Sequence, residues 1–146
     1  PLYSSAASDV YKRQIFASEG EEGFRAVEAA CIAEALHGFD GVLSLGGGAV
    51  LAESTRAALA GHPVVFIHVA HGELVRRISG SPTPRPLLEG DPGGRLAALW
   101  RERHDIYRRC ARYTVESDEG PAWRVARRVL DLLGRPDARV RGEPAP

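Results

Sequence analysis

Apolar residues recur along the chain with a spacing that changes from one segment to the next. One helical stripe runs through Phe24, Val27, Cys31 and Ala35. Their spacing of three or four positions predicts a helix from about residue 19 to residue 37. The S-x-x-E sequence at 18–21 fits a capping box at its start, and Gly38 fits a C-cap at its end.

Short apolar runs without helical spacing predict strands. These runs are 41–48, in which a strand is expected to end in a tight turn at the three glycines, 63–69 and 113–117. The second of them, PVVFIHV, is apolar and largely β-branched, which suits a parallel strand covered on both faces. Further helices are expected over 49–61, 71–79, 95–111 and 121–133. Strands that alternate with helices predict an α/β fold with a mostly parallel sheet, for which three strands are few.

Three segments lack either period. Residues 1–14 differ in pattern from the rest of the chain, and we interpret them as foreign to it, an artefact of the sequence. Residues 80–94 are rich in Gly and Pro, which indicates a lid or a binding loop. The polar, Pro-rich tail at 134–146 indicates a disordered end or a linker. The expected core is therefore 15–133.

Charge and cysteine content narrow the range of functions. Lys+Arg and Asp+Glu balance at 19 each, so no net field favours nucleic acid or an anionic membrane as a partner. Cys31 and Cys110 are too few for a disulfide framework or a zinc cluster, and the histidines lack metal-ligand spacing. No apolar run reaches transmembrane length. These features predict a cytoplasmic protein.

The candidate chemistry rests on arginines and a glycine triplet. Gly46, Gly47 and Gly48 follow an apolar run, where they form either a tight turn or a backbone ligand site. Arg25 either pairs with Glu21 or Glu28, each one helical turn away, or binds an anion. Arg85 in the loop is either solvated or able to neutralise charge during phosphoryl transfer. Arg103 lies in a charged helical run, which alone indicates a solvated face.

Taken in order, these segments resemble one known family. The sequences IFASEGEEGFRAVE, LSLGGGAV, RRISGSPTPRPLL and RERHDIY are similar to the corresponding segments of shikimate kinases, and the similarity covers most of 15–133. The resemblance implies a P-loop nucleoside-monophosphate-kinase fold, with a parallel sheet between layers of helices. It also implies transfer of the γ-phosphoryl group of ATP, with Mg²⁺, to the 3-hydroxyl of shikimate in aromatic amino acid biosynthesis.

The resemblance also implies roles for individual residues. Arg25 and Arg103 match the two arginines that bind the shikimate carboxylate, and the triplet 46–48 matches a turn whose backbone contacts shikimate. Arg85 matches the catalytic lid arginine that reaches the phosphates of ATP. Arg77 matches an arginine at the base of the lid, near the adenine.

The chain departs from the family at its start. No segment matches G-x-x-x-x-G-K-[ST], and the expected Mg²⁺ ligands and the paired aspartates belong to the same unmatched region. We therefore expect an N-terminally truncated, incomplete sheet and an inactive chain, whereas an intact relative is expected to be a monomer.

Three alternatives stay open. One is another small-molecule kinase of this fold, such as a gluconate kinase. Another is a non-catalytic remnant that binds a ligand without turnover. The third is a piece of a fused multi-enzyme chain, in which the tail is a linker.

Overall fold

The computed structural model describes residues 5–79, 92–117 and 120–135. The chain divides into two compact units, residues 1–60 and 61–146. The first unit contains α1 (Ser5–Gly38), the 3₁₀ turn η1 (Ala49–Leu51) and α2 (Glu53–Leu59). The second contains β1 (Val65–His68), α3 (His71–Ser79), α4 (Pro92–Cys110), β2 (Tyr113–Glu116) and α5 (Ala122–Leu132).

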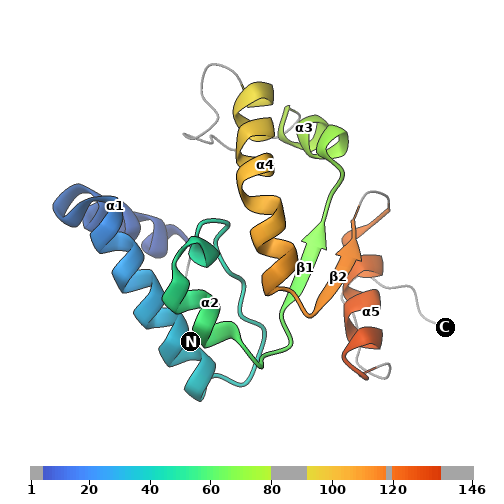
Figure 1. Cartoon of the computed structure of the whole chain (residues 1–146), viewed down its shortest axis with the longest axis horizontal. Helices are drawn as coiled ribbons and strands as arrows, with labels where there is room; N and C mark the ends of the chain where they lie inside the picture. The colour runs from blue at the N-terminus through green and yellow to red at the C-terminus, as the bar shows by residue number, and fades with distance from the viewer. Residues whose placement is uncertain (1–4, 80–91, 118–119, 136–146) are drawn as a thin grey trace. The chain divides into compact units, whose positions relative to one another are not determined.

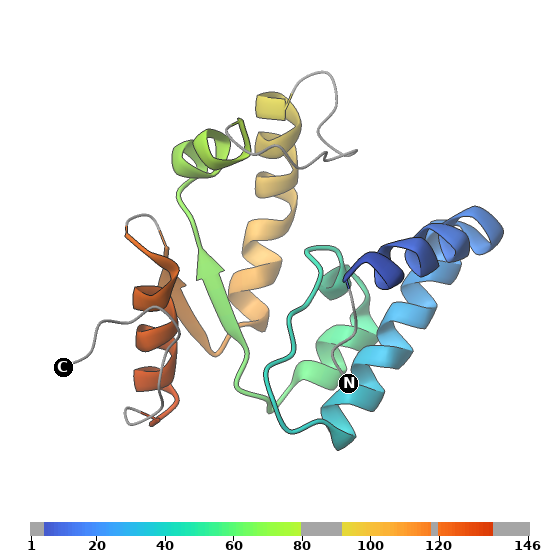
Figure 2. The ribbon, with the colours of Figure 1, turned by 180° about the vertical axis from the view of Figure 1, so that it is seen from behind.

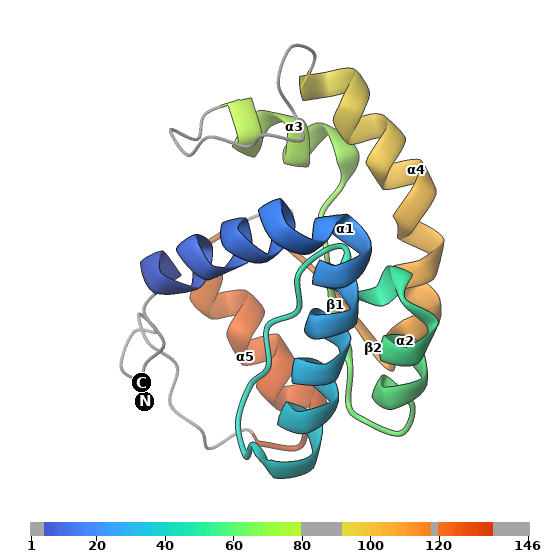
Figure 3. The ribbon, with the colours of Figure 1, turned by 90° about the vertical axis from the view of Figure 1, so that its left-hand side faces the viewer.

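The long helix α1 is two helical segments joined at Gly20. Gly20 has φ 70° and ψ −170°, a conformation that glycine adopts far more readily than other residues. Figure 3 shows α1 changing direction along its length. The helix predicted over 19–37 is confirmed beyond this kink, and it ends at Gly38. Gly38 is not among the described glycines with positive φ, so the left-handed C-cap is not formed.

The strand predicted in the first part of 41–48 is wrong, whereas the tight turn predicted at its glycines is present. Residues 42–46 have no regular secondary structure, and the side chain of Val42 is 93% exposed. An apolar run becomes a strand only when a neighbouring strand takes up its backbone hydrogen bonds, and no described residue of this unit does so for 42–46.

The helix predicted over 49–61 is confirmed in two pieces. Ala52 is extended, with φ −70° and ψ 128°, and it separates η1 from α2. Helix α2 lies against α1, as Figures 1 and 3 show. Apolar side chains from all three elements form the core of this unit: Ile32, Ala49, Val50 and Leu59.

The second unit confirms the predicted α/β fold, because its two strands pair in parallel. Strands β1 and β2 run parallel, and Val65 pairs with Tyr113 through to His68 with Glu116. The remaining helices predicted from the sequence match α3, α4 and α5 within a few residues. Two strands are described instead of the three expected.

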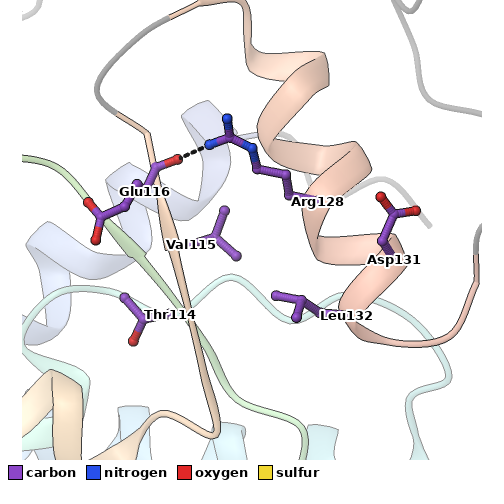
Figure 4. Close-up of a pocket in the computed structure, with 6 residues that line it drawn as sticks. All are labelled: Thr114, Val115, Glu116, Arg128, Asp131 and Leu132. Atoms are coloured by element: carbon purple, nitrogen blue, oxygen red, sulfur yellow. Dashed lines mark hydrogen bonds between the residues drawn. The ribbon is translucent and has the colours of Figure 1, made fainter.

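Helices α4 and α5 lie against opposite faces of this two-stranded sheet. Phe66 and His68 project from one face of β1, where their rings meet the rings of α4. Helix α5 lies beside β2, as Figures 1 and 2 show. Between β2 and α5, Val115 and Leu132 point toward one another, and Arg128 Nη1 donates to the Glu116 carbonyl at 3.1 Å (Figure 4).

Candidate functional site

The glycine triplet forms a tight turn followed by a turn of 3₁₀ helix. Ala49 N donates to the Gly46 carbonyl at 3.0 Å, and Leu51 N donates to the Gly48 carbonyl at 3.0 Å. None of these glycines has positive φ. The backbone conformation therefore does not require glycine here, and the reason must be the space that a side chain would occupy.

Arg25 supplies that reason. A Cβ atom added to Gly48 would lie 2.7 Å from Arg25 Cζ and 2.8 Å from Arg25 Nη1, and it would also overlap Nη2. Real Cβ atoms do not approach other atoms so closely. The guanidinium of Arg25 therefore rests directly on the backbone at Gly48, so the structure brings together two predicted site elements that lie over twenty positions apart in the sequence.

Two glutamates of α1 hold Arg25 in this position. Arg25 Nη1 donates to Glu28 Oε2 at 2.6 Å, and Arg25 Nη2 lies 3.7 Å from Glu21 Oε1. The side chains of Arg25 and Glu28 are 26% and 19% exposed, while that of Glu21 is 70% exposed. Both pairings that the sequence allowed are present, but they differ in strength, because an exposed pair at 3.7 Å is weaker than a half-buried charge-assisted hydrogen bond.

Glu28 is a site residue that the helical spacing predicts only as a partner for Arg25. A Cβ atom added to Gly46 would meet Glu28 Oε1 at 3.2 Å, so Glu28 touches the glycine turn as well as Arg25. Its position three residues after Arg25, on the same face of the helix, was the available signal.

Arg56 fixes the far end of the turn. Its Nη1 donates to the carbonyls of Val50 at 2.8 Å and Leu51 at 2.7 Å, both of which belong to η1. These charge-assisted hydrogen bonds hold η1 against α2. No periodic pattern in the sequence marks this contact.

In the second unit, Arg77 is held by hydrogen bonds at both of its edges. Its Nε donates to Glu73 Oε1 at 2.6 Å, and its Nη2 donates to the Ser117 carbonyl. Arg76 donates to the same carboxylate at 2.6 and 2.7 Å. Hydrogen bonds from Arg76 and then Arg77 lower the pKa of Glu73 to about 2.

Arg103 lies in the middle of α4 with a side chain that is 17% exposed. Its Nε lies 3.4 Å from Glu102 Oε1. The solvated helix face that the charged run alone indicated is therefore not its environment. Arg85, the fourth arginine of the predicted site, lies outside the described residues.

The described ranges contain neither a metal cluster nor a membrane span. No three His, Cys, Asp or Glu side chains within them are arranged to hold a metal ion. Among the same residues, no helix combines the length and the hydropathy needed to cross a bilayer.

Comparison with known proteins gives a consistent result. The shikimate kinase family profile matches residues 6–134. The chain is 51% identical over 105 residues to a shikimate kinase of Thermobifida fusca, covering 72% of this chain and 60% of that protein. It is 45% identical over 123 residues to a shikimate kinase of Mycobacterium bovis, covering 84% of this chain and 69% of that protein.

Solved structures of shikimate kinases are similar to this chain in fold. A shikimate kinase from Acinetobacter baumannii, in complex with shikimate, superposes with a TM-score of 0.72 at 32% identity, covering 82% of this chain and 68% of that one. A shikimate kinase from Bacteroides thetaiotaomicron gives a TM-score of 0.71 at 26% identity, and the match covers 84% of this chain and 74% of that one. The chain thus spans about three fifths of the length of the Thermobifida protein and somewhat more of the others.

Proposed function

Because this chain belongs to the shikimate kinase family, we propose that its site serves the transfer of the γ-phosphoryl group of ATP to the 3-hydroxyl of shikimate, while turnover by this chain is not expected, since no segment of it matches the P-loop. The observation that carries the proposal is the contact between Arg25 and the glycine turn at 46–48. A half-buried guanidinium beside backbone N–H groups suits a small molecule that carries one carboxylate and several hydroxyls.

In this proposal the substrate carboxylate replaces Glu21 on Arg25. Nη1 is already engaged by Glu28 at 2.6 Å, whereas Nη2 pairs with the exposed Glu21 at 3.7 Å. A bound carboxylate exchanges that weak contact for a charge-assisted hydrogen bond. Glu28 stays in place and keeps the guanidinium oriented.

The remaining arginines take roles that rest on the family resemblance. Arg103 is a second carboxylate ligand, Arg77 lies beside the adenine of ATP, and Arg85 neutralises the transferring phosphoryl group when its loop closes. Among the described residues, no three His, Cys, Asp or Glu side chains lie together as a Mg²⁺ site would require. The part of the reaction that these residues supply is positioning and charge neutralisation.

The test is a binding titration followed by a phosphoryl-transfer assay on the whole chain. Shikimate is titrated by calorimetry into the wild type, into Arg25→Ala and into Arg108→Ala, a matched control at an exposed arginine of α4. Loss of one or two charge-assisted hydrogen bonds should weaken binding about 10- to 100-fold in Arg25→Ala and leave the control unchanged. ADP release is then measured with shikimate and with gluconate.

Each result has a distinct meaning. Shikimate-dependent ADP release supports the kinase, whereas faster release with gluconate favours the related kinase of the same fold. Shikimate binding that depends on Arg25, without ADP release, favours a ligand-binding protein without turnover. Equal shikimate affinity in the wild type and Arg25→Ala contradicts the proposed site.

A further inference from the structure

Helix α3 carries a glutamate that is shared by two arginines. Glu73 precedes Arg76 by three positions and Arg77 by four, which places all three side chains on one face of the helix. Its carboxylate accepts three hydrogen bonds of 2.6–2.7 Å, two from Arg76 and one from Arg77. The arginines differ in what else they reach, because Arg76 is largely exposed whereas Arg77 extends to another element.

Arg77 links α3 to the residue that follows β2. Its Nη2 donates to the Ser117 carbonyl, and its Nη1 lies 3.4 Å from Ser117 Oγ. Ser117 is itself held, because its N–H donates to the His68 carbonyl at 2.8 Å and so extends the β1–β2 ladder by one rung. Both ends of the Arg77 contact are therefore attached to regular structure.

Contacts at two edges restrict the position and orientation of a guanidinium more than a single contact does. The group is planar, so Glu73 on the Nε edge and Ser117 on the far edge together fix the position of the group and restrict the orientation of its plane. The orientation of that plane decides which flat partner can lie against it. Without Glu73, the Nε edge loses its carboxylate, so the orientation of the guanidinium plane is less restricted.

We propose that Glu73 is a positioning residue, which orients the Arg77 guanidinium for the purine base of the nucleotide. The inference rests on the proposed function through the role given there to Arg77. The contact between Arg77 and Ser117 lies just beyond the carboxyl end of β2. The carboxyl ends of parallel strands form the edge of the sheet where ligands of α/β proteins bind. Hydrogen bonds from Arg76 and Arg77 lower the pKa of Glu73 to about 2, as expected for a carboxylate held between two cations.

The experiment compares Glu73→Gln with three other variants of the whole chain. Glu73→Asp keeps the charge on a shorter side chain, and Arg76→Ala removes the other arginine on Glu73 without touching Arg77. Glu53→Gln is the matched control, an exposed glutamate in the first turn of α2. Two readouts are measured for each variant: the Arg77 Nε–Hε resonance in ¹H–¹⁵N spectra, assigned with Arg77→Lys, and the dissociation constants for ATP and shikimate.

We expect the Arg77 resonance to lose its protection from exchange in Glu73→Gln and to keep it in Arg76→Ala and Glu53→Gln. The ATP dissociation constant should rise about tenfold in Glu73→Gln, as for the loss of one charge-assisted hydrogen bond, with partial recovery in Glu73→Asp. The shikimate dissociation constant should not change. A merely structural role would weaken both ligands together.

Three outcomes overturn the inference. A protected Arg77 resonance in Glu73→Gln shows that Glu73 does not hold the arginine. A released Arg77 with unchanged ATP affinity shows that its orientation has no part in nucleotide binding. Because no segment of this chain matches the P-loop, a wild type that binds no ATP is tested further with adenosine, which presents the purine base without the phosphates. A wild type that binds neither ATP nor adenosine refutes the nucleotide role of Arg77 in the proposed function, and the Arg77 resonance would still report the contact with Glu73.

Discussion

Replacing Gly48 by alanine tests the contact between Arg25 and the glycine turn. The backbone at Gly48, with φ −91° and ψ −13°, is open to alanine without strain. By itself the substitution should stabilise the fold by about 0.4–1 kcal/mol, because alanine lowers the entropy of the unfolded chain. Any destabilisation must therefore come from the new methyl group.

The methyl group has no room while Arg25 stays in place. It would lie 2.7 Å from Arg25 Cζ, so the guanidinium must shift, and we expect the shift to break its 2.6 Å hydrogen bond to Glu28. Losing a half-buried, charge-assisted hydrogen bond costs about 1.5–3 kcal/mol, and the residual exposure of both side chains places the value at the lower end. The net expectation is a loss of about 1 kcal/mol, with weaker shikimate binding.

Urea unfolding of a double-mutant cycle measures this coupling. With Arg25→Ala already present the clash is gone, so Gly48→Ala should become neutral or stabilising. Gly46→Ala is a milder comparison, because its Cβ meets Glu28 Oε1 at 3.2 Å, a contact that a small shift relieves. If Gly48→Ala changes the free energy of unfolding equally in both backgrounds, Arg25 is not what excludes a side chain at position 48.

Other substitutions test the surroundings of the site. Gly72→Ala in α3 should raise stability by about 0.5–1 kcal/mol in thermal or urea unfolding, since apart from its two chain neighbours and the backbone of its own helix no described residue places an atom within 4 Å of the added Cβ; a loss would indicate that the helix is packed there. Thr55→Val should raise the unfolding free energy by about 1 kcal/mol, because Thr55 Oγ1 is buried with no hydrogen-bond partner among the described residues; a clear decrease would reveal one. Glu73 has a pKa lowered from 4.5 to about 2, so its stabilising contribution is complete above about pH 4.5 and is lost as the pH falls toward 2. Acid titration followed by circular dichroism should show this loss in the wild type, and an equal acid response in Glu73→Gln would contradict it.

The sequence predicted the elements whose own pattern was sufficient to define them. The run predicted as a strand over 63–69 forms β1 at 65–68, and the stripes of α4 and α5 formed as expected, because each packs on neighbours within its own unit. The run at 41–48 reads equally well as a strand, yet it lacks a described pairing partner and stays irregular. The pattern of apolar residues indicates which secondary structure a segment favours, whereas a strand forms only if a second strand lies beside it.

The candidate site was predictable in its residue types more than in its contacts. The order of the family-like segments along the chain identified Arg25 and the triplet 46–48 as site residues. That order did not predict the contact of the Arg25 guanidinium with the backbone at Gly48. The contact of Arg77 with Ser117 joins residues 40 positions apart, which no local pattern can predict. Such contacts follow from the fold, so a sequence can name the residues without revealing how they meet.

The parallel pairing of β1 and β2 has a consequence for how the second unit folds. Parallel strands cannot be joined by a tight turn, and His68 meets Glu116 across 48 positions of chain. The chain between them must lose much of its freedom before the first rung of the ladder forms, which slows folding relative to local helix pairing. We therefore expect the α1–α2 contacts to form early and the β1–β2 ladder to set the rate at which the protein reaches its native state.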